Sequence, residues 1–181
     1  MKTALIPLAQ GCEELEAITI TDILSRAGIK VTTAGLNEEL VIASQGTALK
    51  PDTNLNAIQD SSFDLIALPG GLPGADHLAE SKILLTMLKK QYQSGKTVAA
   101  ICAAPKVLVA AEILPGHRYT CYPTSLAAFD LPESSTNEAV VIDSNVITGR
   151  GPGVAMDFAL TLVNELCGKE KRDEVETALV R

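Results

Sequence analysis

The stretch TVAAICAAP, residues 97–105, is the part of the sequence that decides the fold. An apolar run stops at Cys102, and two alanines and Pro105 follow it. Continuous apolarity is typical of a strand that is buried on both faces of a parallel sheet. Pro105 suits the first turn of a helix, where its missing N–H costs little. The stretch therefore predicts a tight strand-to-helix turn that presents a thiol at the edge of a sheet.

Comparable β-type runs occur on both sides of this stretch, and helix-length amphipathic segments separate several of them. This alternation predicts an α/β fold with a mainly parallel central sheet. Residues 40–51 predict a small hairpin or an edge excursion around Gln45 and Gly46, and residues 129–137 predict a loop. The β-type runs are TALIPLA (3–9), KVTTAG (30–35), DLIALPG (64–70), AVVID (139–143) and NVITG (145–149), and the candidate helices are 14–27, 81–93, 104–113 and 153–167.

The composition limits the classes of function. A chain of 181 residues that is 46% apolar can bury a sizeable core, and we expect one domain over residues 1–181. The net charge of −7 argues against a specific nucleic-acid partner. No apolar run approaches the roughly 20 residues that a membrane-spanning helix needs. Four cysteines without CxxC spacing indicate neither a disulfide framework nor a zinc site, so we expect a protein of the reducing cytoplasm.

Four unusual turns follow the predicted strands. Because ligands bind beyond the carboxyl ends of the strands in open α/β sheets, we expect these turns to meet at one edge. The carboxylates of the first turn and the spacing of the last exclude a dinucleotide site, which needs glycines and bare N–H groups. The turns are GCEELE (11–16), PGGLPG (69–74), CAAP (102–105) and GRGPG (149–153).

The thiol and the acidic turn are the candidate reactive groups. The turn at Cys102 resembles the nucleophile elbow of hydrolases, and a helix N-terminus there predicts a thiol pKa below about 8.5. The alternative is a buried cysteine that packs as a small apolar residue. In the acidic turn, alternation with Leu15 and Ile18 predicts that one carboxylate points inward, where burial raises its pKa, and that the others are ordinary partners of the helix dipole.

Taken together, four motifs make the chain resemble the ThiJ/PfpI superfamily, most of all the branch of the Parkinson's-disease-associated protein deglycase and its bacterial ThiJ-like relatives. The motifs are GCEELEA (11–17), LPGG (68–71), AAICAAP (99–105) and GRGPG (149–153). The resemblance implies a flavodoxin-like three-layer sandwich, a homodimer and a cysteine on the elbow. It also implies that the protein needs no metal and no organic cofactor.

The resemblance assigns roles to individual residues. It implies that Cys102 is the nucleophile and that Glu16 is the carboxyl group that hydrogen-bonds it. The backbone N–H groups of Gly71 and Ala103 would form an oxyanion pocket, and Gly70 would allow the close approach.

Three further residues, Tyr122, Arg150 and Pro152, are predicted to contact the substrate. Tyr122 stands where relatives often carry a histidine, and a phenol with a pKa near 10 is a poor base at neutral pH. Gln45 stands where some relatives have an arginine, which leaves Arg26 and Arg150 as the cations near the site. Arg150 could equally pair with a carboxylate and hold its loop in shape.

The resemblance implies a cysteine-dependent glyoxalase or deglycase that acts on methylglyoxal and related α-oxoaldehydes, or on glycated protein and nucleotide adducts, under oxidative and carbonyl stress. The alternative is a redox sensor or redox-regulated chaperone whose cysteine is oxidised to sulfinate. Both functions need a reactive Cys102, so the motif does not separate them. Ala103 follows the nucleophile and no histidine lies beyond His117, which argues against the protease and amidotransferase branches.

The remaining histidines and cysteines have ordinary interpretations. We expect His77 and His117 to face solvent. Cys121 is expected to pack rather than to act as a resolving thiol for Cys102. Cys12 is expected to be a small spacer, and Cys167 is expected to lie on the apolar face of the last predicted helix.

Overall fold

The computed structural model describes residues 1–37, 39–129, 131 and 136–181. Its centre is a seven-stranded sheet with the strand order β5-β2-β1-β6-β7-β9-β8. Every neighbouring pair is parallel except β8 and β9. The strands are β1 (Thr3–Leu8), β2 (Lys30–Gly35), β5 (Thr53–Asn54), β6 (Leu65–Leu68), β7 (Thr97–Ile101), β8 (Val140–Asp143) and β9 (Val146–Gly149).

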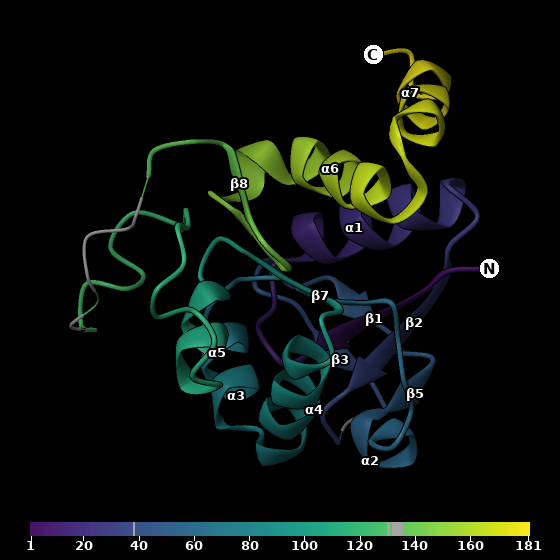
Figure 1. Ribbon diagram of the computed structural model, residues 1–181. Coiled ribbons are helices and arrows are strands. Elements are labelled where there is room, and N and C mark those ends of the chain that lie inside the picture. Colours follow the sequence, from purple (N-terminus) through teal and green to yellow (C-terminus); the bar gives the residue numbers. More distant parts are fainter. Residues whose placement is uncertain (38, 130, 132–135) are drawn as a thin grey trace.

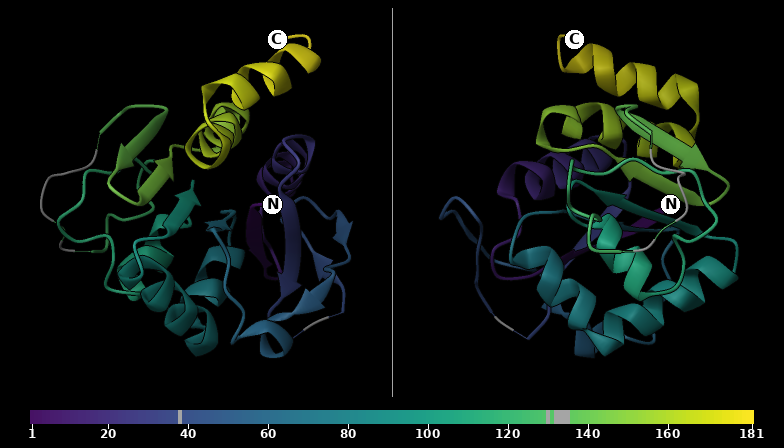
Figure 2. Two further views of the ribbon diagram at one scale, coloured as in Figure 1. Left: turned by 45° about the vertical axis from the view of Figure 1, so that its right-hand side comes forward. Right: turned by 90° about the vertical axis from the view of Figure 1, so that its left-hand side faces the viewer.

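Helices cover both faces of the sheet. Figure 1 shows α1 and α6 on one face and α3, α4 and α5 on the other. In Figure 2, α7 is stacked on α6, on the side away from the sheet. The helices are α1 (Glu14–Arg26), α2 (Leu55–Ile58), α3 (Gly74–Glu80), α4 (Lys82–Gln93), α5 (Pro105–Ala110), α6 (Ala155–Cys167) and α7 (Lys169–Ala178), with a 3₁₀ turn at Pro152–Val154.

Two hydrophobic cores lie on opposite sides of the sheet, because successive side chains of a strand point to opposite faces. In β7, Ala99 and Ile101 belong to the core under α1 and α6, whereas Val98 and Ala100 belong to the core under α3, α4 and α5. All four residues are fully buried. The predicted three-layer α/β sandwich with a mainly parallel sheet is therefore confirmed, as are the six predicted strand runs.

The predicted hairpin is also present. Strands β3 (Val41–Ile42) and β4 (Ala48–Leu49) pair antiparallel as a separate two-stranded sheet. The loop predicted at residues 129–137 falls partly on residues 130 and 132–135, which lie outside the described residues.

Three helices were not predicted, and α5 is shorter than the predicted helix at 104–113. The most instructive is α7, in which Val175 alone is buried. A helix without an apolar stripe gives no helical periodicity in the sequence. Ion pairs one turn apart, such as Lys169 with Asp173 and Arg172 with Glu176, support α7 instead. Among the described residues, no helix is long and apolar enough to span a membrane.

Candidate active site

The elbow after β7 holds Cys102 in a strained backbone conformation. Its φ is 63°, in the left-handed region that non-glycine residues rarely adopt. The backbone N–H of Cys102 donates to the carbonyl oxygen of Gly149 at 2.9 Å, which ties the elbow to the end of β9. Pro105 then begins α5. The predicted strand-to-helix turn is present, and it turns the Cys102 side chain to the side of the sheet that α1 covers.

Glu16, in the first turn of α1, is the inward-pointing carboxylate. Its side chain is fully buried, and its Oε2 accepts a hydrogen bond of 2.7 Å from the backbone N–H of Gly70. Its Oε1 is buried without a partner of regular geometry among the described residues, and the thiol of Cys102 interacts with the same carboxyl group. Burial raises the pKa of Glu16 to about 7, although the Gly70 N–H and the Cys102 thiol both act to lower it.

The expected lowering of the Cys102 pKa is wrong. Burial, and after it the negative charge of Glu16, raises the pKa of this thiol to about 12. The backbone N–H groups of Gly71 and Ala103 hydrogen-bond the sulfur and act in the opposite direction. The prediction relied on the N-terminus of the following helix and left out the carboxylate beside the thiol. The charge of that carboxylate is absent whenever Glu16 is protonated.

Glycines allow the turn after β6 to approach the elbow. A Cβ at Gly70 would lie 2.7 Å from the Cβ of Cys102 and 2.8 Å from the carbonyl oxygen of Ile101. A Cβ at Gly71 would lie 2.3 Å from the backbone nitrogen of Glu13, and the φ of Gly71 is 87°. Neither position has room for a side chain, so the close approach predicted for Gly70 is present in the structure.

Glu14 has a structural role that the sequence did not indicate. Its carboxylate accepts hydrogen bonds from the backbone N–H groups of Gln45 and Thr47 and from the hydroxyl of Ser44. Burial acts to raise its pKa, but hydrogen bonds from backbone N–H groups outweigh that effect and hold the pKa at about 2. Glu14 therefore fastens the β3–β4 hairpin to the helical turn that carries Glu16.

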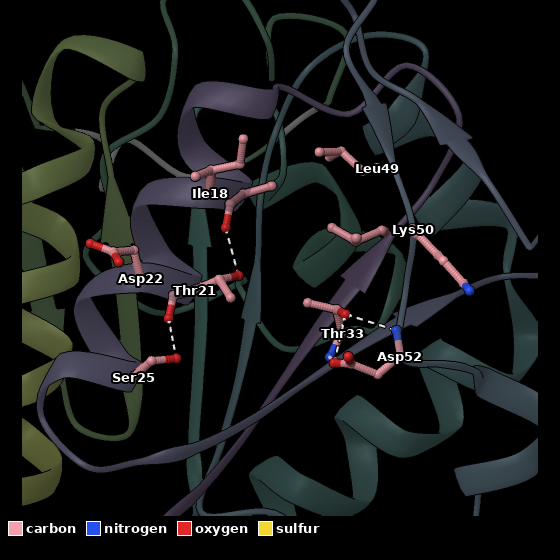
Figure 3. Close-up of a pocket in the computed structure, with 10 residues that line it drawn as sticks. Ile18, Thr21, Asp22, Ser25, Thr33, Leu49, Lys50 and Asp52 are labelled. Atoms are coloured by element: carbon pink, nitrogen blue, oxygen red, sulfur yellow. Dashed lines mark hydrogen bonds between the residues drawn. The ribbon is translucent and has the colours of Figure 1, made fainter.

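Alternation along α1 does not follow the prediction, because Leu15 and Ile18 are about half exposed while Glu14 and Glu16 are buried. Ile18 forms part of the wall of a hollow of ≈ 410 Å³ between α1 and β4. Figure 3 shows labelled side chains that line this hollow. They come from α1, β2 and the segment at β4, and Cys102 is not among the residues that line the hollow. It is lined by Leu8, Ala17, Ile18, Thr21, Asp22, Ser25, Thr33, Leu49, Lys50 and Asp52.

The three other predicted substrate contacts lie together beside the elbow. The backbone N–H of Tyr122 donates to the carbonyl oxygen of Cys102 at 2.8 Å, and half of the Tyr122 surface is exposed. Arg150 Nη1 donates to Asn137 Oδ1 at 2.7 Å, so the amide takes the place of the carboxylate partner considered above. Tyr122, Arg150 and Pro152 line one hollow of ≈ 230 Å³.

Arg26 is not a cation of this site. It lies in the last turn of α1, ten residues from Glu16, which corresponds to about 15 Å along a helix. Its guanidinium pairs with Asp22 at 2.6 Å.

The expectation that both histidines face solvent is wrong for His117. The ring of His117 is largely buried: its Nε2 lies 2.9 Å from the Tyr92 hydroxyl and its Nδ1 lies 3.3 Å from Asp143 Oδ2. His77 is half-buried and its Nδ1 lies 3.1 Å from the carbonyl oxygen of Gln10. Isolated histidines give no signal of such partners in the sequence.

The cysteines are all free thiols. Cys12 is fully buried, and Cys121 packs against the core under α3, α4 and α5, as expected. Cys102 belongs to the core on the other side of the sheet. Cys167 is exposed, which corrects its expected place on an apolar face. Among the described residues, no three His, Cys, Asp or Glu side chains are grouped so as to hold a metal ion.

Comparison with known proteins gives consistent matches over the chain. The model of the DJ-1/PfpI family matches residues 2–165. Protein dj-1beta of Drosophila melanogaster is 44% identical over 181 residues, which cover 99% of this chain and 97% of that protein. Glutathione-independent glyoxalase DJR-1.2 of Caenorhabditis elegans is 39% identical and covers 96% of this chain and 94% of its own. The structure of Toxoplasma gondii DJ-1, oxidized, superposes with a TM-score of 0.95 at 36% identity, covering 99% of this chain and 98% of that one.

Proposed function

The chain belongs to the DJ-1/PfpI family, and from this premise we propose that it is a cysteine-dependent glyoxalase that acts on methylglyoxal and related α-oxoaldehydes without glutathione, metal or organic cofactor. The observation that carries the proposal is the buried pair of Cys102 and Glu16. A carboxyl group whose pKa is about 7 beside a thiol is an acid–base group suited to moving protons at neutral pH. The similarity to a protein named as a glutathione-independent glyoxalase supports the same reaction.

The reaction begins with the carboxylate form of Glu16. Glu16 takes the proton of the Cys102 thiol while the sulfur attacks the aldehyde carbon of methylglyoxal, which forms the C–S bond of a hemithioacetal. The N–H groups of Gly71 and Ala103, which already point at the sulfur, stabilise the oxygen that becomes negative.

Proton transfer completes the conversion. Glu16 first gives the thiol proton to the negative oxygen, which forms the hydroxyl group of the hemithioacetal and restores the carboxylate. The carboxylate then carries the proton of the former aldehyde carbon to the neighbouring carbon, while the hydroxyl proton passes to the ketone oxygen. The first carbon is thereby oxidised to a thioester and the ketone is reduced to a carbinol. Water then cleaves the C–S bond, releases lactate and restores the thiol. Methylglyoxal and one water give one lactate, and no external oxidant or reductant enters.

The experiment that tests this proposal is lactate formation from methylglyoxal in the absence of glutathione and metal. The purified protein is compared with Cys102→Ser and Glu16→Gln variants whose folding is checked by circular dichroism. We expect turnover in the parent protein and its loss in both variants. A parent protein that makes no more lactate than Cys102→Ser contradicts the proposal.

A second candidate function is oxidation sensing through Cys102. It is favoured by the similarity to the Toxoplasma gondii DJ-1 structure, which is of the oxidized protein. In this chain the Gly71 and Ala103 N–H groups around the sulfur would also stabilise the anion of an oxidised cysteine. Peroxide treatment followed by intact-mass measurement tests it: Cys102 should gain two oxygens before the other thiols change.

The proposal also covers the substrates and the cellular location of the protein. Free α-oxoaldehydes, or glycated proteins and nucleotides that release them, are the proposed substrates, with deglycation as a related activity. We place the protein in the cytoplasm, where its free thiols stay reduced.

A homodimer is also part of the proposal. Apolar side chains that are about half exposed gather on α1 and beside the hairpin, and the hollow of Figure 3 lies between these elements. A second copy of the chain would cover this surface, because exposed apolar patches of this kind mark protein interfaces. The side chains are Leu15, Ile18, Leu40 and Ile42. Sedimentation of the parent protein and of Ile18→Glu tests it, with a monomeric variant expected.

A further inference from the structure

The hollow next to Tyr122 is larger than the conversion of methylglyoxal requires. Its volume is ≈ 230 Å³, whereas methylglyoxal carries only a methyl group beside its two carbonyls. A cavity of about 150 Å³ is enough to hold a benzene molecule. The hollow is lined by Tyr122, Pro123, Arg150, Gly151, Pro152, Gly153 and Val154.

Both walls of the hollow begin at groups that are hydrogen-bonded to the nucleophile. The backbone N–H of Tyr122 donates to the carbonyl oxygen of Cys102 at 2.8 Å. The backbone N–H of Cys102 donates to the carbonyl oxygen of Gly149 at 2.9 Å, and the chain continues from there into the second wall. The hollow is therefore fixed to the elbow by two backbone hydrogen bonds.

The groups that line the hollow are those that bind flat aromatic rings. A phenol ring, two proline rings, a valine side chain and part of Arg150 line it, and no acidic side chain is among them. Phenol rings stack on aromatic rings or meet them edge to face.

We propose that this hollow holds the substituent of the substrate, so that the enzyme prefers aryl α-oxoaldehydes to methylglyoxal. The inference rests on the proposed glyoxalase function and specifies its substrate class. Phenylglyoxal represents the class: with one water it gives one mandelate, because the aldehyde carbon is oxidised to a carboxylate while the ketone carbon is reduced to a carbinol. The Cys102–aldehyde C–S bond forms and is later broken by water, and Glu16 moves the proton between the two carbons.

A glycine of the second wall provides a variant that narrows the hollow. At Gly151 the backbone is extended, with φ 171°, so alanine is tolerated there, and its Cβ would lie 3.4 Å from Cδ2 of the Tyr122 ring. Gly151→Ala therefore fills part of the hollow without strain. The control is Glu170→Ala, an exposed position in α7, a helix that does not line the hollow.

The test is the ratio of kcat/KM for phenylglyoxal to kcat/KM for methylglyoxal. We expect a ratio of about ten or more in the parent protein, which is the usual discrimination of a shaped apolar pocket. Gly151→Ala and Tyr122→Ala should each lower the ratio about fivefold or more, and Glu170→Ala should leave it within about twofold. Initial rates are used, and peptide mass mapping verifies that phenylglyoxal has not modified Arg150 during the assay.

Turnover of methylglyoxal with an equal ratio in the parent protein, Gly151→Ala and Tyr122→Ala overturns this inference and leaves the proposed function standing. If neither aldehyde is converted, the proposed function fails. A binding measurement then tests whether the hollow holds an aryl group. In Cys102→Ser, calorimetric titration should show that mandelate binds about tenfold more tightly than lactate, and adding Gly151→Ala should remove the difference. Equal binding of the two acids overturns the inference.

Discussion

The backbone N–H of Gly70 and the carboxylate of Glu16 are joined by a hydrogen bond of 2.7 Å, although 54 residues separate them in the sequence. This bond fixes one carboxylate oxygen and leaves the other beside the thiol of Cys102. The turn after β6 thus positions the acid–base group as well as the N–H group of Gly71 that faces the sulfur.

The activity should rise with pH through about 7, because Glu16 accepts the thiol proton only when it is ionised and its pKa is about 7. Glu16→Gln should lower kcat/KM by roughly 10²–10⁴-fold and abolish this rise. The measurement is the pH profile of kcat/KM for methylglyoxal from pH 5.5 to pH 9. A Glu16→Gln profile that keeps the same inflection would assign it to another group.

The stability should also depend on Glu16. Its pKa in the folded state, about 7, is above its ordinary value of 4.5. Below pH 4.5 the carboxyl group of Glu16 is protonated in both states, so it adds no pH dependence to the free energy of unfolding. Between pH 4.5 and pH 7 the carboxyl group loses its proton in the unfolded chain but keeps it in the folded protein, which favours unfolding. The free energy of unfolding, relative to Glu16→Gln, should therefore fall by about 3 kcal/mol as the pH rises from about 4.5 to above 7. Urea unfolding of both proteins across this range measures it, and a constant difference would contradict the raised pKa.

The Glu16→Gln substitution should speed the alkylation of Cys102, although it slows turnover. At pH 8 the ionised Glu16 raises the pKa of the thiol, and Glu16→Gln removes this charge. The rate of Cys102 alkylation by iodoacetamide should then increase about threefold or more, since the thiolate is the reacting form. Peptide mapping gives the rate, and the exposed Cys167 in the same sample serves as the control. A slower reaction in the variant would mean that Glu16 promotes the thiolate.

The glycine after β6 should not tolerate a methyl group. Gly70→Ala would place a Cβ 2.7 Å from the Cβ of Cys102 and 2.8 Å from a backbone oxygen, so the elbow must shift. We expect a loss of about 1–3 kcal/mol in the free energy of unfolding and at least a tenfold loss in kcat/KM. For the free energy of unfolding, Gly153→Ala is the control, because its added methyl group meets nothing within 4 Å. Equal behaviour of the two variants would show that the gap between the turns is wider than described.

The hairpin should loosen when Glu14 loses its charge. Glu14→Gln weakens the hydrogen bonds from the Gln45 and Thr47 N–H groups, and we expect a cost of about 1–3 kcal/mol. Because the pKa of Glu14 is lowered to about 2, this contribution is present above about pH 4.5 and is lost as the pH falls toward 2. Hydrogen exchange at Gln45 and Thr47 reports it, with Glu170→Gln in α7 as the control. Unchanged protection in Glu14→Gln would refute the tether.

The strands and the elbow could be predicted because they depend on local patterns. Buried apolar runs such as residues 97–101 and the position of Pro105 carry their own signal. The pKa of Cys102 could not be predicted, because it depends on a carboxylate brought from another element and on burial. The partners of His117 likewise come from Tyr92 and Asp143, distant in sequence. That residues 1–181 form one domain stays a prediction.

The left-handed backbone at Cys102 has a consequence for how this chain can change over generations. A cysteine with φ 63° costs the fold on the order of 1 kcal/mol in backbone strain. Strain of this kind persists only where the surrounding structure fixes it, so the elbow is a position at which function has been retained against stability.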